Sequence, residues 1–98
     1  MSDVGLSDPE RVERARLAKE LQENRVLNEA LDRMRDLAIE TLEATSLRDP
    51  EGLAIVHQKL KVIRLFSDVL AGYVEDGKLA LVDWDKAKDV RKRRFSVL

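Results

Sequence analysis

The segment from Pro50 to Asp76 constrains the fold most, because its apolar residues form two parallel rows at helical spacing. A helix of this length extends about 40 Å. One row consists of Leu53, Val56, Leu60, Ile63, Leu70 and Val74, and the other of Ile55, Val62, Phe66, Val69 and Tyr73. A single neighbouring helix covers a single row. The second row therefore predicts a second partner, which is either the start of the chain folded back or a neighbouring subunit.

Short polar motifs predict where the helices begin and end. Asp8-Pro9-Glu10 and Asp49-Pro50-Glu51 each combine a capping carboxylate with a proline that suits the first helical turn. Ser7 is an alternative cap for the first helix, since a glutamate follows three residues later. Gly77 predicts the end of the long helix, because glycine adopts the left-handed conformation of a helix terminus at little cost.

Two further helices are predicted before residue 45. A thin apolar stripe runs from 9 to 23, and a stronger one runs from Val26 to Ala44. Asn24 leaves open whether a new helix begins there or one helix continues with a bend. The short connection at 45–50 makes its flanking helices antiparallel neighbours. The expected fold is all-α: an antiparallel helical hairpin with a preceding helix and a short C-terminal helix, from Trp84 to Lys92, that ends in a tail.

Charge is distributed unevenly along the chain. Residues 1–85 hold 12 basic and 18 acidic side chains, a balance of −6, whereas residues 86–98 hold 6 basic and 1 acidic, a balance of +5. We therefore divide the chain into a hairpin or oligomerisation domain at 1–78 and an apolar patch with a basic tail at 79–98. The tail residues expected to bind a partner or DNA are Arg91, Lys92, Arg93, Arg94 and Phe95.

Few residues are suited to catalysis or metal binding. The chain has no cysteine, which excludes disulfides and thiolate metal sites. Its one histidine, His57, has Lys61 and Arg64 on the same polar stripe, and these cations would not orient it as a base. We expect no enzymatic activity, no cofactor and no metal site. The absence of a long apolar run predicts a cytoplasmic protein without membrane contact.

The two apolar rows of the segment Pro50–Asp76 together form a wide apolar arc, and this arc favours a homo-oligomer. A single small helical hairpin supplies only about 3–5 kcal/mol from its core, and no disulfide supplements it. In the alternative, the first segment and an apolar patch at Leu79, Leu81, Val82 and Trp84 cover the second row, and the protein is a monomeric bundle.

The residues that mark the starts and ends of the helices resemble those of small helical proteins from the morphogenesis regions of tailed phages and prophages. The stretches 18–34 and 45–80 carry it, through Glu23-Asn24, Asp49, Glu51-Gly52 and Gly77-Lys78-Leu79-Ala80. Within that group, the chain resembles the oligomerisation core of a small terminase subunit, a familiar phage protein with an oligomerising antiparallel helix pair. The resemblance implies a role in head assembly or DNA packaging, with a large terminase, a portal or another phage protein as partner.

Three functions remain open at this level. The first is a non-enzymatic phage assembly or DNA-packaging protein that forms an oligomer and recruits its partner through the basic tail. The second is a small helical inhibitor or regulatory adaptor that grips a host protein with the same apolar arc. The third is a nucleic-acid binder that acts through the tail alone, with an affinity that falls as salt rises.

Overall fold

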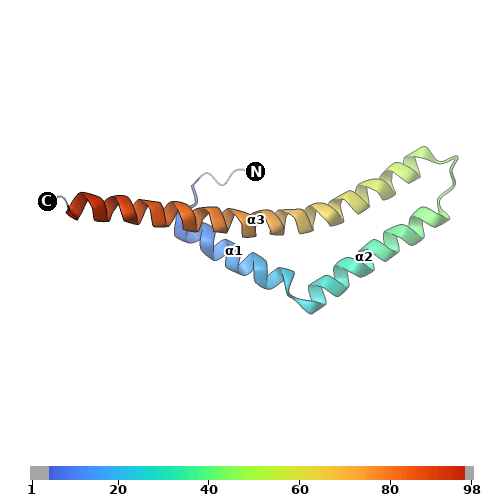
Figure 1. The fold of residues 1–98 in the computed structure, drawn as a ribbon. Coiled ribbons are helices and arrows are strands. Elements are labelled where there is room, and N and C mark those ends of the chain that lie inside the picture. The colour runs from blue at the N-terminus through green and yellow to red at the C-terminus, as the bar shows by residue number, and fades with distance from the viewer. Residues whose placement is uncertain (1–4, 97–98) are drawn as a thin grey trace. The chain divides into compact units, whose positions relative to one another are not determined.

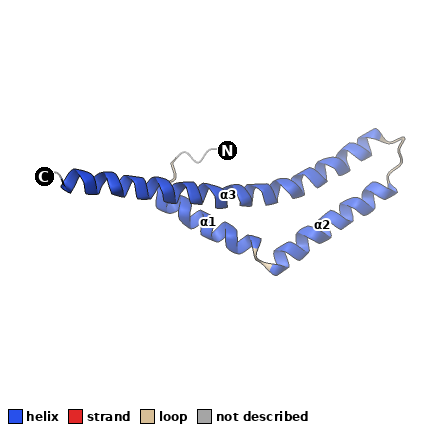
Figure 2. Cartoon of the chain, in the orientation of Figure 1, coloured by secondary structure: helices blue, strands red, loops and turns tan. Residues whose placement is uncertain are grey.

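A computed structural model describes the backbone of residues 5–96 and the side chains of residues 5–88. Three helices account for nearly all of this range: α1 (Asp8–Gln22), α2 (Arg25–Ala44) and α3 (Pro50–Ser96) (Figure 1). Residues 5–96 contain no strand, which confirms the all-α fold class (Figure 2).

The motifs that begin α1 and α3 act as helix caps. The carboxylate of Asp49 accepts a hydrogen bond from the Gly52 amide at 3.0 Å, as expected for the cap of α3. In α1 the cap is Ser7, whose hydroxyl accepts from the Glu10 amide at 3.3 Å. Asp8 already lies inside the helix, so the alternative cap is the correct one and the expectation for Asp8 is wrong.

Asn24 separates α1 from α2, which settles the open question of a break or a bend. Its backbone is extended, with φ −73° and ψ 115°, and its side chain accepts a hydrogen bond from the Leu27 amide at 2.9 Å. The Asn28 side chain donates to the Gln22 carbonyl at 2.9 Å, so it satisfies a carbonyl at the end of α1. Local side-chain hydrogen bonds therefore replace the helical ones at this junction.

The helix predicted to end at Gly77 does not end there, because α3 continues without interruption to Ser96. Gly5 is the only residue of the described backbone with a positive φ, so Gly77 does not take the left-handed conformation of a helix terminus. The predicted short helix from Trp84 to Lys92 is not a separate element, because α3 continues through these residues. Residues 78–88 are mostly good helix formers, so a single glycine is insufficient to stop the helix.

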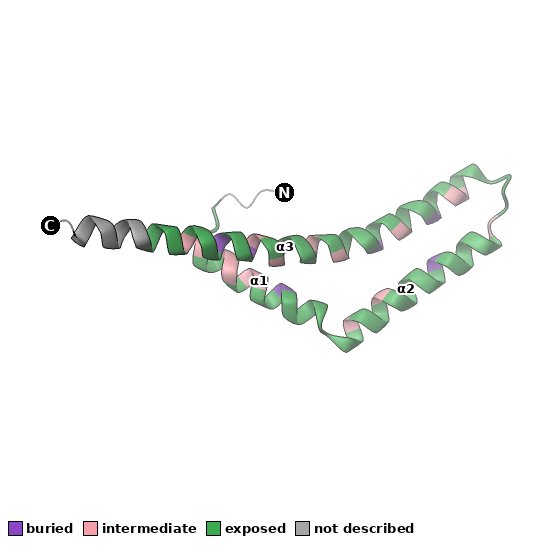
Figure 3. Ribbon diagram, viewed as in Figure 1, coloured by how far each residue is buried: buried purple, intermediate pink, exposed green. Residues whose placement is uncertain are grey.

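The chain divides into two compact units: residues 1–20 with 70–98, and residues 21–69. In the second unit, α2 and the first part of α3 form the expected antiparallel hairpin across residues 45–49. Ala38, Val56 and Ile63 are buried in its seam (Figure 3). On α3 the buried residues recur every seven positions, the spacing typical of paired helices in a coiled coil.

In the first unit, α1 lies antiparallel to α3, and small residues bring the two helices close together. Ala18 and Ala80 are buried there, together with Leu70. Gly77 is buried against Ala15, and a Cβ at Gly77 would overlap the methyl group of Ala15. The role of this glycine is therefore close helix packing.

The expected division at residue 78 has no counterpart in the secondary structure, since α3 passes through it, and it stays a prediction about function. The described helices include no stretch that is long and apolar enough to cross a bilayer.

Candidate functional site

An apolar groove runs between α2 and α3 in the unit formed by residues 21–69. It encloses about 630 Å³. Four residues of α2 and five of α3 line it: Met34, Leu37, Ala38, Thr41, Ile55, Gln58, Lys59, Val62 and Ile63. The volume lies in the range of sites that receive a ligand or part of a partner protein.

The walls of the groove are exposed, whereas its floor is buried. Met34 is 51% exposed, Ile55 53% and Val62 63%, while Ala38 and Ile63 are both buried. The floor thus belongs to the hairpin seam, and the walls carry large apolar side chains without cover from the described residues. A contiguous exposed surface of this kind marks an interaction site more often than scattered apolar residues do.

The polar groups of the groove are few, and one of them is already satisfied. The Thr41 hydroxyl donates to the Leu37 carbonyl at 2.9 Å, within α2 itself. Gln58 and Lys59 are the other polar residues of the lining, and no carboxylate is among them. The long methylene stem of a lysine can lie along an apolar surface while its ammonium group stays in water. The groove is therefore suited to an apolar helix surface.

The two predicted rows of α3 differ in their surroundings. In the first row, Val56, Ile63 and Leu70 are buried, and Leu53, Leu60 and Val74 are half-buried, so other parts of the same chain cover this row. In the second row, Ile55, Val62 and Phe66 are exposed, and Val69 and Tyr73 are half-buried. The residues expected at an oligomer interface thus separate into an internal seam and an open face.

The apolar patch that was to cover the second row in a monomeric bundle lies on α3 itself. Leu79, Leu81 and Val82 are exposed, and Trp84 is half-buried with the Lys88 ammonium 4.8 Å from its ring centre. Because the patch and the row belong to one continuous helix, the patch does not fold back over that row.

The basic residues Arg91–Arg94 and Phe95 lie in the last turns of α3, and their side chains are outside the described residues. The backbone nevertheless shows that this segment is helical and is not an extended tail.

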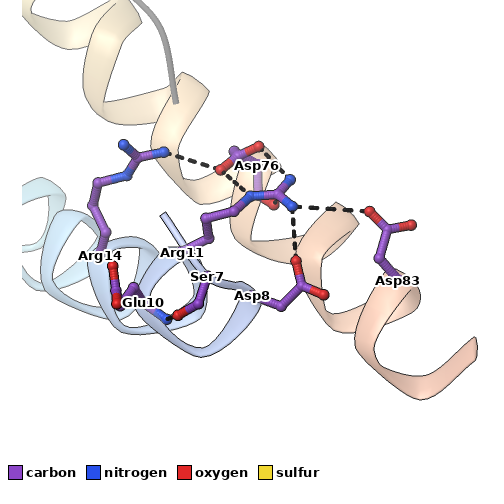
Figure 4. A network of polar contacts seen from close by, with 7 residues as sticks. All are labelled: Ser7, Asp8, Glu10, Arg11, Arg14, Asp76 and Asp83. Carbon is purple, nitrogen blue, oxygen red and sulfur yellow. Dashed lines mark hydrogen bonds and ion pairs between the residues drawn. The ribbon is translucent and has the colours of Figure 1, made fainter. Parts of the chain in front are cut away.

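A second cluster, in the unit formed by residues 1–20 and 70–98, is polar (Figure 4). Arg11 of α1 contacts Asp76 of α3 twice, with Nη2–Oδ1 at 2.6 Å and Nε–Oδ2 at 2.9 Å. Arg14 Nη2 lies 3.0 Å from Asp76 Oδ2, and its guanidinium carbon lies 4.1 Å from the centre of the Tyr73 ring. Asp8 binds Arg11 Nη1 at 3.0 Å. One carboxylate thus joins two arginines of the facing helix.

The contact between Arg11 and Asp76 shifts the pKa values of both groups. Hydrogen bonds from Arg11 hold the pKa of Asp76 below its ordinary value, with the charges of Arg11 and Arg14 acting in the same direction. The same hydrogen bonds raise the pKa of Arg11. Both shifts favour the charged forms of Arg11 and Asp76, so this ion pair is suited to fixing α1 on α3 and not to proton transfer.

The described residues offer little for metal binding. They contain no group of three or more His, Asp or Glu side chains arranged to hold a metal ion. His57 is exposed on α3, in keeping with its predicted place on the polar stripe.

Sequence reasoning missed the Arg11–Asp76 contact and the packing of Gly77 on Ala15. These residues lie more than 60 positions apart, and only the pairing of α1 with α3 brings them together. The available signal was the seven-residue spacing of Leu70, Gly77 and Trp84, which places the glycine in the helix seam.

Comparisons of the chain with family models, with curated proteins and with solved structures give no match. Function is therefore inferred from the groove and from the distribution of charge.

Proposed function

We propose that the chain is a non-enzymatic assembly protein that acts as a homo-oligomer. The helical body forms the oligomer, and the basic end of α3 recruits a partner. This is the role implied by the resemblance to the oligomerisation core of a small terminase, and head assembly or DNA packaging is the proposed setting.

The observation that supports this proposal is the exposed apolar wall of the groove between α2 and α3. Met34 is 51% exposed, Ile55 53% and Val62 63%, although all three line the groove. Apolar side chains that gather on one exposed surface mark an interaction site more often than scattered ones do.

The small size of the core also supports a homo-oligomer. Half of the six buried hydrophobic residues among the described part of the chain are alanines, Ala18, Ala38 and Ala80. Such side chains bury little apolar area, so the internal seam contributes little stability. Covering the exposed walls of the groove adds the apolar burial that one chain lacks.

Sedimentation velocity over micromolar concentrations tests the proposal. We expect a species whose mass is a multiple of 11.2 kDa and whose proportion rises with concentration. A single 11.2 kDa species throughout, with a stable fold, would contradict the assembly role. That result would favour the regulatory adaptor, in which the same groove receives a host protein.

A further inference from the structure

We infer that α1 is a releasable arm: charge holds it on α3, and it leaves α3 while the hairpin of α2 and α3 stays folded. The contact involved lies in the unit formed by residues 1–20 and 70–98. The inference requires no second copy of the chain, so it is independent of the proposed oligomer.

The apolar contact that α1 makes is small. The buried and half-buried apolar residues of this helix are Val12, Ala15 and Ala18. Leu17, a larger apolar side chain of α1, is 46% exposed and adds little to the contact. Because one valine and two alanines bury little apolar area, hydrophobic burial alone holds α1 weakly.

The carboxylate of Asp76 supplies most of the charged contact (Figure 4). It accepts hydrogen bonds from Arg11 Nε at 2.9 Å, from Arg11 Nη2 at 2.6 Å and from Arg14 Nη2 at 3.0 Å. Arg11 Nη1 also lies 3.9 Å from Asp83 Oδ2. The side chains of Arg11, Arg14 and Asp76 are between 17% and 24% exposed, so dissolved ions screen these pairs in part. The attachment of α1 therefore depends on one acidic residue and on ionic strength.

The hairpin does not need α1 in place. Its second helix begins with contacts of its own, because Asn24 accepts hydrogen bonds from the Leu27 amide, at 2.9 Å, and from the Asn28 amide, at 3.1 Å. The buried residues of the hairpin seam, including Val56 and Ile63, belong to residues 21–69. Segments with few buried contacts open locally while the rest of a protein stays folded. We therefore expect α1 to open without the hairpin.

Release of α1 uncovers one face of α3. Gly77 packs against Ala15, and Ala80 lies three residues further along α3, on the same face. Ala80 is 0% exposed, and α1 is the helix that faces it in this unit. Ionic conditions thus control whether this close-packing face of α3 is accessible.

Two buried alanines provide a matched test, since the chain has no cysteine. Ala80 lies under α1, whereas Ala38 lies in the hairpin seam and is 5% exposed. Ala80→Cys and Ala38→Cys each place a single thiol at a buried position. The rate at which excess iodoacetamide alkylates each thiol reports how often its cover opens. Circular dichroism verifies that both variants keep their helix content.

Asp76→Asn should free only the thiol under α1. We expect the alkylation rate at position 80 to rise roughly tenfold or more, because two arginines lose their ionised partner. The rate at position 38 should stay within about twofold. The control is Glu75→Gln, which removes a neighbouring charge paired with exposed Lys78 and should leave both rates within about twofold.

Two further measurements leave out one substitution each. When sodium chloride is raised from about 0.05 to about 1 M, the rate at position 80 should rise several-fold relative to the rate at position 38, because the ion pairs are screened. Hydrogen exchange followed by mass spectrometry needs no thiol. In Asp76→Asn, peptides from residues 8–20 should exchange faster and peptides from residues 25–44 should not.

Rates that rise together at both positions would overturn the inference, because α1 would then open only when the hairpin unfolds. A rate at position 80 that is unchanged by Asp76→Asn or by salt would also overturn it. All samples are compared at one protein concentration. A monomeric mass in sedimentation would contradict the proposed oligomer and leave the release of α1 unaffected.

Discussion

The guanidinium group of Arg11 meets the carboxylate of Asp76 through two parallel contacts, at 2.6 and 2.9 Å. The side chains of both residues are less than a fifth exposed. Planar, two-point pairing of this kind is stronger and more directional than a single ion pair. It fixes α1 on α3 although α1 is rich in charge and buries only Ala18 fully.

Acid should weaken this contact. The pKa of Asp76 in the folded chain lies below its ordinary value of 3.8, so its ion pairs stabilise the fold fully above that value. The stabilisation is lost as pH falls through the lower, folded-state pKa. Asp76→Asn should therefore lower the thermal midpoint at neutral pH. The difference in midpoint between this variant and the unmodified chain should shrink as the pH falls below about 4.

The control for this measurement is Glu75→Gln. Glu75 is the neighbouring residue, and it pairs only with the exposed Lys78 among the contacts described, at 2.9 Å. Exposed pairs of this type contribute little, so its midpoint should barely move. All samples need the same protein concentration, because association also shifts the midpoint. A gap for Asp76→Asn that stays constant down to pH 2 would refute the role of its charge.

Two glycines of α3 should respond to alanine with opposite signs. At Gly77 the new methyl group overlaps Ala15, and we expect a loss of about 1–3 kcal/mol in the free energy of unfolding. At Gly72 a Cβ meets nothing within 4 Å, so alanine should add about 0.5–1 kcal/mol through helix propensity. Chemical denaturation of both variants measures the difference. Equal effects at the two sites would show that close packing at Gly77 is unimportant.

The seam of the hairpin should be far more sensitive than its outer face. Ile63 is 4% exposed, and Ile63→Ala should cost about 2–5 kcal/mol through lost burial and the cavity it leaves. Leu65 lies two residues further along the same helix and is 58% exposed, so Leu65→Ala should stay within about 0.5 kcal/mol. Denaturant titration compares them, and similar losses would contradict the seam as described.

Removal of residues 91–98 should leave the oligomer intact and abolish binding through the basic end. In a mobility-shift titration with duplex DNA, the full chain should bind at low salt, with a slope of log affinity against log salt of about −3 to −4 for four phosphate contacts. The shortened chain should not bind. A slope near zero, or equal binding by both chains, would exclude DNA contact through these residues.

The sequence was sufficient to predict the helical class, the hairpin and the start of α3, because local signals determine them. Asp49 caps α3 as expected, and the loop before it is short enough to require antiparallel helices. The end of α3 was not predictable from Gly77, since the same residue serves at a helix terminus or at a tight helix contact. Only the position of Ala15 in space decides between them.

Only part of the candidate site was predictable, because local periodicity is visible in the sequence and the register between helices is not. Periodicity identified the second row of α3, but it did not reveal which of its residues stay exposed. Ile55 and Val62 form a groove wall with Met34 and Leu37 of α2, a pairing that depends on the register of the hairpin. Register is a tertiary property, and the apolar stripe of α2 alone does not determine it.

The molar mass of the unmodified chain in solution tests the central claim most directly. Size-exclusion chromatography with light scattering at micromolar concentration should give a mass of at least twice the 11.2 kDa of one chain. A folded protein that stays at 11.2 kDa across that range would contradict an assembly protein built on self-association.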